Sequence, residues 1–175
     1  MRKSPPATFE KNVFINCPFD KQYKVLLQPL LFTILYLKLN PRIATERLDS
    51  GEQRIDKICE LLSESKFSIH DISRLKSAAA DEYYRLNMAL ELGVDYGCRK
   101  FALGRSKRKK FLILERDRYN FIIAVSDLGG VDIRSHSNKP TLLVKAVRDW
   151  FASQMHTERI ASDERIWNDY CMFTG

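Results

Sequence analysis

Short apolar runs alternate along this chain with longer segments in which apolar residues recur at helical spacing. Five such runs predict strands, at residues 12–17, 41–46, 66–70, 111–115 and 131–134. Alternation of strands and helices is typical of a parallel sheet with helices on both faces, because parallel strands need a crossover between them. We therefore predict a three-layer α/β/α fold with a central parallel sheet of about five strands.

Helical spacing predicts helices at residues 21–38, 52–64, 81–98 and 141–156, whereas residues 119–128 fit either a strand or a short helix. The first helix is apolar almost all round, so we expect the sheet on one side and a neighbouring helix or a second subunit on the other. Pro29 should bend this helix or cut off its first turns.

The length of 175 residues and the hydrophobic content of 45% fit one domain with a real core. We expect a flexible lead-in over residues 1–10, an α/β domain over 11–156 and a docking segment over 157–175. Four well-separated cysteines favour a reducing compartment over a zinc ribbon or a disulfide framework: Cys17, Cys59, Cys98 and Cys171. With no apolar leader and with Lys24, Gln28 and Pro29 interrupting the first helix, we expect a cytoplasmic protein with no membrane span and no metal.

The net charge of +7 is concentrated in one acid-free run. Its cations are Arg99, Lys100, Arg105, Lys107, Arg108, Lys109 and Lys110. Such a run is typical either of a nucleic-acid or phosphate patch or of a solvated loop. Phe101 is the one aromatic residue inside it, so we favour the solvated loop and keep nucleic acid as a less favoured partner.

Ligands of open parallel sheets bind beyond the carboxyl ends of the strands. The candidate binding residues that this rule selects are Phe19, Asp20, Arg47, Asp71, Ser73 and Arg74. For Asp71 and Ser73 the alternative is that they cap the following turn, and His70 fits a packed histidine better than a catalyst.

The helix over residues 81–98 carries a polar stripe on an otherwise apolar surface. Asn87, Glu91 and Asp95 stand at i, i+4 and i+8, so we expect them on one face, either satisfied by neighbours or lining a cleft. Gly93 and Gly97 each cost roughly 1 kcal/mol in a helix interior, which predicts that something approaches this backbone closely.

Neither G-x-G-x-x-G after the first strand, nor a P-loop, nor a G-x-S-x-G elbow is present in the sequence. Three pieces of the chain nevertheless resemble the Toll/interleukin-1 receptor (TIR) fold, and more closely its bacterial TIR-like and nucleoside 2-deoxyribosyltransferase-like relatives, which have a flavodoxin-like fold. They are Phe14-Ile15-Asn16, the acid-serine loop at residues 71–73, and the helical segment Arg85-Leu86-Asn87-Met88-Ala89-Leu90-Glu91-Leu92-Gly93.

The resemblance implies that Glu91, with Asn87 one turn before it, works at the anomeric carbon of a nucleoside or of NAD, which would be the substrate rather than a cofactor. It further implies a role in bacterial immune signalling, through NAD depletion or a cyclic nucleotide messenger. A homo-oligomer is expected, and an effector protein is a further candidate partner. Tyr83, Tyr84 and Leu86 stand where many catalytic TIR domains carry a Trp-Cys pair, a difference that bears on NAD cleavage in particular.

A nucleotide at this edge would stack its base on Phe19, place ribose hydroxyls near Asp71, Ser73 and Asn87, and place phosphates near Arg47, Arg54 or Arg74. Three functions stay open at this point: an N-glycosidase or transferase, a non-catalytic nucleotide-sensing module, and a nucleic-acid-binding module. For Glu91 the alternative to catalysis is a carboxylate satisfied by Arg54 or Arg85.

Overall fold

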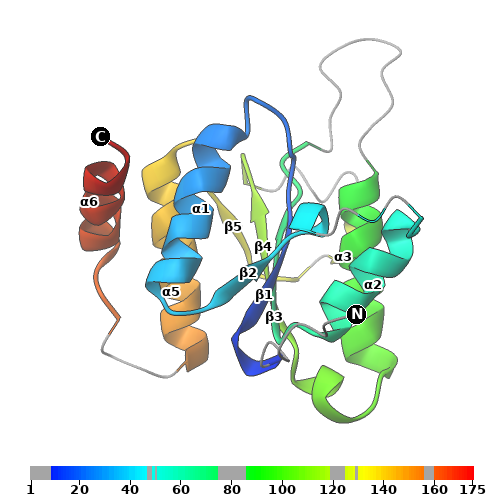
Figure 1. Cartoon of the computed structure of the whole chain (residues 1–175). Helices are drawn as coiled ribbons and strands as arrows, with labels where there is room; N and C mark the ends of the chain where they lie inside the picture. Colours follow the sequence, from blue (N-terminus) through cyan, green and yellow to red (C-terminus); the bar gives the residue numbers. More distant parts are fainter. Residues whose placement is uncertain are drawn as a thin grey trace.

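The protein is described by a computed structural model over residues 9–46, 49, 51–74, 86–118, 125–128, 130–155 and 160–175. Its five-stranded sheet has the order β2-β1-β3-β4-β5, and every neighbouring pair is parallel (Figure 1). The strands are β1 (Asn12–Asn16), β2 (Asn40–Arg42), β3 (Phe67–Asp71), β4 (Lys110–Glu115) and β5 (Ile133–Ser135). Helices cover both faces, which confirms the predicted three-layer α/β/α, flavodoxin-like fold.

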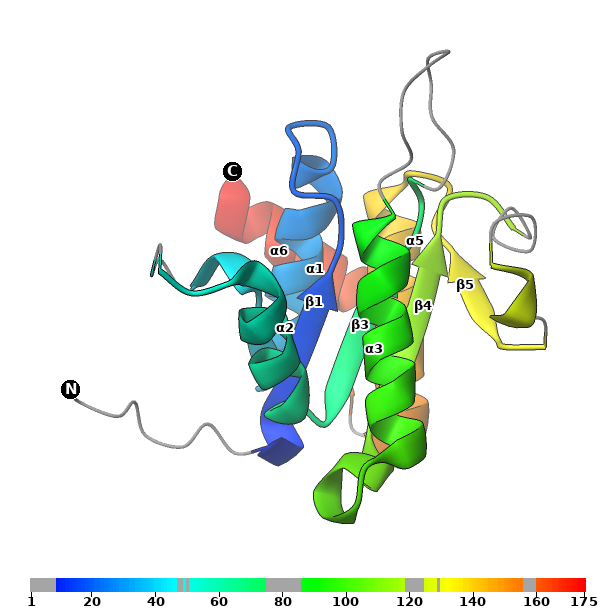
Figure 2. The ribbon, with the colours of Figure 1, turned by 90° about the vertical axis from the view of Figure 1, so that its right-hand side faces the viewer.

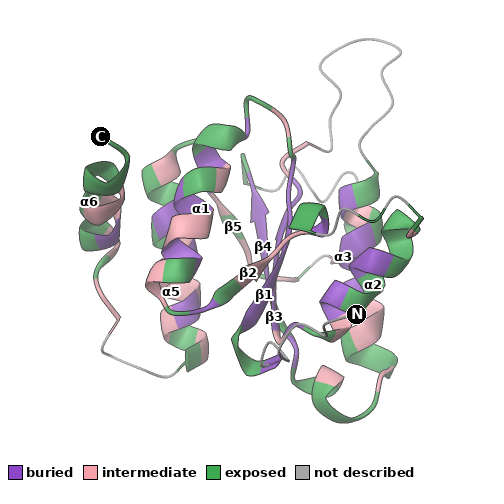
Figure 3. Cartoon of the chain, viewed as in Figure 1, coloured by how far each residue is buried: buried purple, intermediate pink, exposed green. Residues whose placement is uncertain are grey.

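The two faces of the sheet are covered by different sets of helices (Figures 1 and 2). One face carries α1 (Lys24–Tyr36) and α5 (Pro140–Met155), with α6 (Asp163–Thr174) outside them; the other carries α2 (Arg54–Ser63) and α3 (Asn87–Phe101). Side chains of β1 alternate between the two cores, so Val13 and Ile15 pack toward α1 and α5 while Phe14 packs toward α2. Figure 3 shows the buried residues on the helix sides that face the sheet.

Helix α6 explains why α1 is apolar on nearly every side. The Phe32 ring of α1 lies 5.4 Å from the Tyr170 ring and 5.7 Å from the Phe173 ring, both on α6. The Tyr36 hydroxyl donates to Asp169 Oδ2 at 2.9 Å. A neighbouring helix therefore covers the outer side of α1, so this side no longer argues for a second subunit, and a homo-oligomer stays a prediction.

Several boundaries differ from those predicted. Helix α1 begins at Lys24 rather than residue 21, and Pro29 lies inside it without removing the turn before it. The second strand ends at Arg42, because Glu46 accepts from the Arg42 side chain and from the Ile43 backbone and folds residues 44–46 into a 3-10 turn. Phe9 is buried in a 3-10 turn ahead of β1.

Part of the predicted secondary structure falls outside the described residues: positions 81–85 of the central helix and 119–124 of the ambiguous segment. Residues 126–128 form a 3-10 turn. In the described part of the chain, no helix is long and apolar enough to cross a membrane.

The two glycines of α3 have open space around them. A Cβ built on Gly93 or Gly97 meets no described atom of the chain within 4 Å, so the predicted close approach does not come from this part of the chain. We expect Gly93→Ala to raise the free energy of unfolding by roughly 0.5 to 1 kcal/mol, because alanine has less backbone freedom to lose in a helix. Urea denaturation measures the change.

Gly104 provides the matched control. It also has open space, but its φ of 66° lies in the left-handed region, so Gly104→Ala should destabilise by about 1 kcal/mol. Destabilisation by Gly93→Ala as well would contradict the open space around Gly93 and would indicate that another group packs against α3 there.

Candidate functional site

The carboxyl ends of β1 and β3 bring three acidic side chains around one buried cysteine. Neighbouring β1 and β3 mark the point where the strand order 2-1-3-4-5 reverses, which is where such sheets bind ligands. Burial raises the pKa of the Cys17 thiol well above its ordinary value, and the nearby carboxylates of Asp71, Glu91 and Asp20 raise it further. Three predicted site residues therefore gather at this edge of the sheet.

Glu91 is a poorly solvated carboxylate with one weak partner. It lies on the buried side of α3, with 7% of its side chain exposed. Arg54 Nη2 is 3.8 Å from Glu91 Oε1, while the Arg54 side chain itself is 58% exposed. Burial raises the pKa of Glu91 and Arg54 offsets only part of that effect. Among the described residues, no other group forms a hydrogen bond or ion pair with this carboxylate.

The predicted polar stripe of α3 does not stay on one face. Asn87 is exposed in the first turn, Glu91 is mostly buried and Asp95 is completely buried. Each four-residue step overshoots a helical turn of 3.6 residues by about 40°, so two steps rotate the side chain by about 80°. The stripe thus runs from solvent at Asn87, past the sheet edge at Glu91, into the interior at Asp95.

Asp71, a predicted ribose ligand, is already surrounded by donors of its own chain. The Tyr23 hydroxyl donates to Asp71 Oδ2 at 2.5 Å and His136 Nε2 lies 3.0 Å from the same oxygen. The Ser73 backbone N–H and hydroxyl both donate to Asp71 Oδ1. Burial opposes ionisation, but the hydrogen bonds from His136, Ser73 and Tyr23 outweigh it and hold the pKa of Asp71 below its ordinary value.

Ser73, His136 and Asp71 lie together but cannot work as a nucleophile triad. His136 Nδ1 accepts the Asn138 backbone N–H at 3.1 Å, so the ring proton is on Nε2. That same Nε2 faces both Asp71 Oδ2 and Ser73 Oγ at 3.0 Å. A nitrogen that carries its proton cannot take one from Ser73. The cluster therefore fixes the turn at residues 71–73, directly after β3, as the turn-capping alternative expects.

The other predicted binding residues differ in their contacts and exposure. Asp20 Oδ1 accepts the Tyr23 backbone N–H at 2.9 Å and Arg74 Nη2 at 3.1 Å, so two of the predicted binding residues pair with each other. Phe19 is 39% exposed beyond the end of β1, as base stacking requires. Arg47 lies outside the described residues. The assignments of Phe19, Asp20, Arg47, Asp71, Ser73, Arg74 and Asn87 to a substrate stay predictions.

A chain of buried polar groups runs beneath α3. The Asn16 side-chain amide donates to the Met88 carbonyl at 2.8 Å and faces His70 Nδ1 at 3.1 Å. His70 Nε2 lies 3.0 Å from Asp95 Oδ2, and Lys109 Nζ lies 3.0 Å from Asp95 Oδ1. Burial opposes the ionisation of Asp95, but His70 and then Lys109 outweigh it, so the pKa of Asp95 is lowered. His70 is the packed histidine that the sequence indicates.

Lys109 of the basic run is buried rather than solvated. Its ammonium group also donates to the Leu62 and Ser65 carbonyls at 2.7 Å each, at the carboxyl end of α2. These are carbonyl groups that the end of a helix leaves without a partner. Lys109 thus joins α2, α3 and the start of β4.

Sequence reasoning missed Tyr23, Cys17 and His136. Cys17 directly precedes Pro18 at the end of the first predicted strand, which is a signal for the binding edge. Tyr23 and His136 carry no such signal, because they meet Asp71 across 48 and 65 residues of sequence.

The chain matches no model of a known protein family, and no curated protein sequence matches it. Over the described ranges, no group of three or more His, Cys, Asp or Glu side chains could hold a metal ion.

Replacing Lys109 should strongly destabilise the protein. Lys109→Met leaves Asp95 buried without its cation and α2 with unpaired carbonyls, so we expect a loss of about 3 to 5 kcal/mol in urea denaturation. Lys110→Met, at the exposed neighbouring position, should change stability by less than about 0.5 kcal/mol. The double variant Asp95→Asn/Lys109→Met should recover part of the loss, because no buried charge is left unpaired. Equal losses in the single and double variants would contradict the pairing.

Glu91→Gln distinguishes a site carboxylate from a structural one. A raised pKa in the folded state makes ionised Glu91 destabilising, so the glutamine variant should be more stable than wild type at pH 7, by roughly 0.5 to 2 kcal/mol. The difference should shrink as the pH falls through the raised pKa of Glu91 toward its ordinary value, since both side chains are then neutral. Thermal or urea unfolding from pH 4 to 8 measures it. A network held together by the Arg54 ion pair predicts the opposite sign at pH 7.

Proposed function

We propose that the protein is a TIR-like enzyme that cleaves or transfers at the N-glycosidic bond of NAD or a related nucleotide, with Glu91 as the catalytic carboxylate. The observation that carries the proposal is the state of Glu91: a mostly buried carboxylate of raised pKa at the ligand-binding edge of the sheet, with one long ion pair. Perturbed carboxylates of this kind concentrate at functional sites.

The chemistry needs a carboxylate that water solvates poorly. Breaking an N-glycosidic bond develops positive charge on the ribose ring, and an adjacent carboxylate stabilises that charge or bonds to it. At ~4 Å and an effective dielectric constant near 20, the attraction is roughly 4 kcal/mol. If it acts only in the transition state, it accelerates the reaction about a thousandfold. Because Arg54 is mostly exposed, it competes weakly with such a cation.

The surrounding residues fit supporting roles in this proposal. Phe19 offers an exposed ring for a base, and Asn87 stands one turn before Glu91 on the exposed side of α3. Asp71, Ser73 and His136 hold the turn at residues 71–73 in place, at the edge where ribose would lie. The four free cysteines fit a cytoplasmic protein, and the resemblance to bacterial TIR-like proteins supports a role in immune signalling.

The second candidate is a TIR-like module that senses a nucleotide without turnover. The ion pair between Glu91 and Arg54 favours it, because a paired carboxylate also serves a purely binding site. The two functions differ in product formation, not in ligand affinity.

Product analysis tests the proposal. Concentrated protein is incubated with NAD and, in parallel, with a panel of deoxynucleosides, and the products are separated by HPLC. We expect release of nicotinamide or free base, and a loss of about a thousandfold in rate with Glu91→Gln. Glu164→Gln, an exposed position on α6, makes the same change far from the site and should keep full activity.

Calorimetric titration with NAD accompanies the assay. Binding that survives in Glu91→Gln while turnover is lost supports catalysis by this carboxylate. Tight binding with no product from the wild-type protein, even at high concentration, would overturn the enzyme and leave the sensing module.

A further inference from the structure

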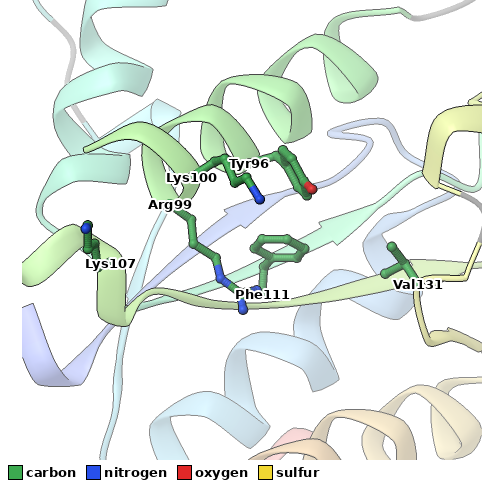
Figure 4. Close-up of a pocket in the computed structure, with 6 residues that line it drawn as sticks. All are labelled: Tyr96, Arg99, Lys100, Lys107, Phe111 and Val131. Carbon is green, nitrogen blue, oxygen red and sulfur yellow. The ribbon is translucent and has the colours of Figure 1, made fainter. Parts of the chain in front are cut away.

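A basic pocket with aromatic walls lies at the other end of α3. Its cavity of about 510 Å³ is lined by Tyr96, Arg99, Lys100, Lys107, Phe111 and Val131. Figure 4 shows Tyr96 and Arg99 reaching from α3 toward Phe111 on β4, with Lys107 on one side and Val131 on the other. None of the described residues that line the pocket is acidic.

The three cations of the pocket are available to a ligand. Arg99 lies over the ring of Phe111, with its guanidinium carbon 5.3 Å from the ring centroid. Within the described part of the chain, Arg99, Lys100 and Lys107 form no ion pair with an acid, whereas Arg108 pairs with Glu10 at 2.8 Å. A stacked guanidinium keeps its N–H donors free for the oxygens of a phosphate.

The aromatic residues supply the second half of a binding site. The Tyr96 and Phe111 rings lie 6.2 Å apart at 55°, and Tyr96 is 43% exposed. An exposed ring beside cations is the arrangement that stacks a nucleobase while the phosphate is neutralised. Tyr96 and Phe111 flank the basic run at residues 99–110 and are not part of it. For this reason the sequence of the run contains Phe101 as its one aromatic residue and does not indicate these two rings.

The pocket is separate from the site of Glu91. Lys100 lies nine residues after Glu91 on α3, roughly 13 Å along the helix axis, while Tyr96 lies five residues after it, roughly 8 Å along the axis and about 140° around the helix. Phe111 lies near the beginning of β4, whereas Glu91 lies near the carboxyl ends of β1 and β3.

We infer that this pocket binds a nucleotide unit, with its base stacked on Tyr96 and its phosphate held by Arg99, Lys100 and Lys107. The unit is either a free nucleotide or one residue of a single-stranded nucleic acid, since both present the same base and phosphate. The site is independent of the proposed chemistry at Glu91.

Binding measurements with two probes test the inference. Fluorescence anisotropy follows a labelled twelve-residue oligo-dT strand across a salt series, and calorimetry follows ADP and inorganic pyrophosphate. Tyr96→Leu should weaken binding at least about fivefold by removing the stacking ring, while Tyr96→Phe should retain it. Log K for binding of the strand falls with the logarithm of the salt concentration. The double variant Arg99→Gln/Lys100→Gln should make this dependence less steep by about 1.4, because two phosphate contacts are lost.

A matched control removes the same charge from the opposite face of the sheet. Arg165→Gln/Lys145→Gln, on α6 and α5, should bind like wild type, and thermal melting checks the fold of each variant. Binding of oligo-dT that exceeds binding of ADP identifies a strand as the ligand, and comparable binding identifies a free nucleotide.

The inference is overturned if neither probe binds, if the control weakens binding as much as the pocket variants do, or if pyrophosphate binds as well as ADP with no effect of Tyr96→Leu. Glu91→Gln should leave binding at this pocket unchanged, so failure here and failure of the proposed catalysis are distinguishable.

Discussion

The buried ion pair between Lys109 and Asp95 organises the α2–α3 side of the molecule. The Lys109 ammonium group contacts Asp95 of α3 and the carbonyl groups at the end of α2. Asp95 in turn contacts His70, and His70 contacts Asn16. Two strands and two helices are thereby joined by polar contacts that water does not reach. The opposite charges of Lys109 and Asp95 compensate each other, since an isolated charge at this depth would cost several kcal/mol. The position of α3, and hence of everything it presents, depends on this chain of contacts.

Glu91 and Asp95 show how environment separates two acids on one helix. Asp95 meets His70 and Lys109 at 3.0 Å, and its pKa is lowered despite burial. Among the described residues, Glu91 meets only Arg54, at 3.8 Å, and its pKa is raised. Neighbouring carboxyl groups whose environments move their pKa values apart are a mark of divided roles. Here Asp95 stabilises the fold, while Glu91 lies where a cationic ligand could stabilise its ionised form.

The parts of the structure that follow from local pattern could be predicted from the sequence, and those that depend on tertiary partners could not. Alternating strands and helices were sufficient for the fold class, because hydrophobic period and crossover topology are local consequences of sequence. The sequence leaves open whether Asp95 is satisfied by neighbours or lines a cleft, and it groups the partner of Asp95, Lys109, with the cations of a solvated run. The contact between His136 and Asp71 could not be predicted from the sequence, because it forms only when β5 pairs with β4.

The basic end of α3 has a structural use that does not account for all of its charge. Arg99 and Lys100 lie in the last turn, where cations favourably oppose the helix dipole. Lys107, however, lies outside the helix, and Arg99 is directed over Phe111. Among the described residues, Arg54 is the charge that acts on the pKa of Glu91. The helix dipole therefore does not account for the position of Lys107 or for the direction of Arg99, as the proposed nucleotide pocket at this end of α3 requires.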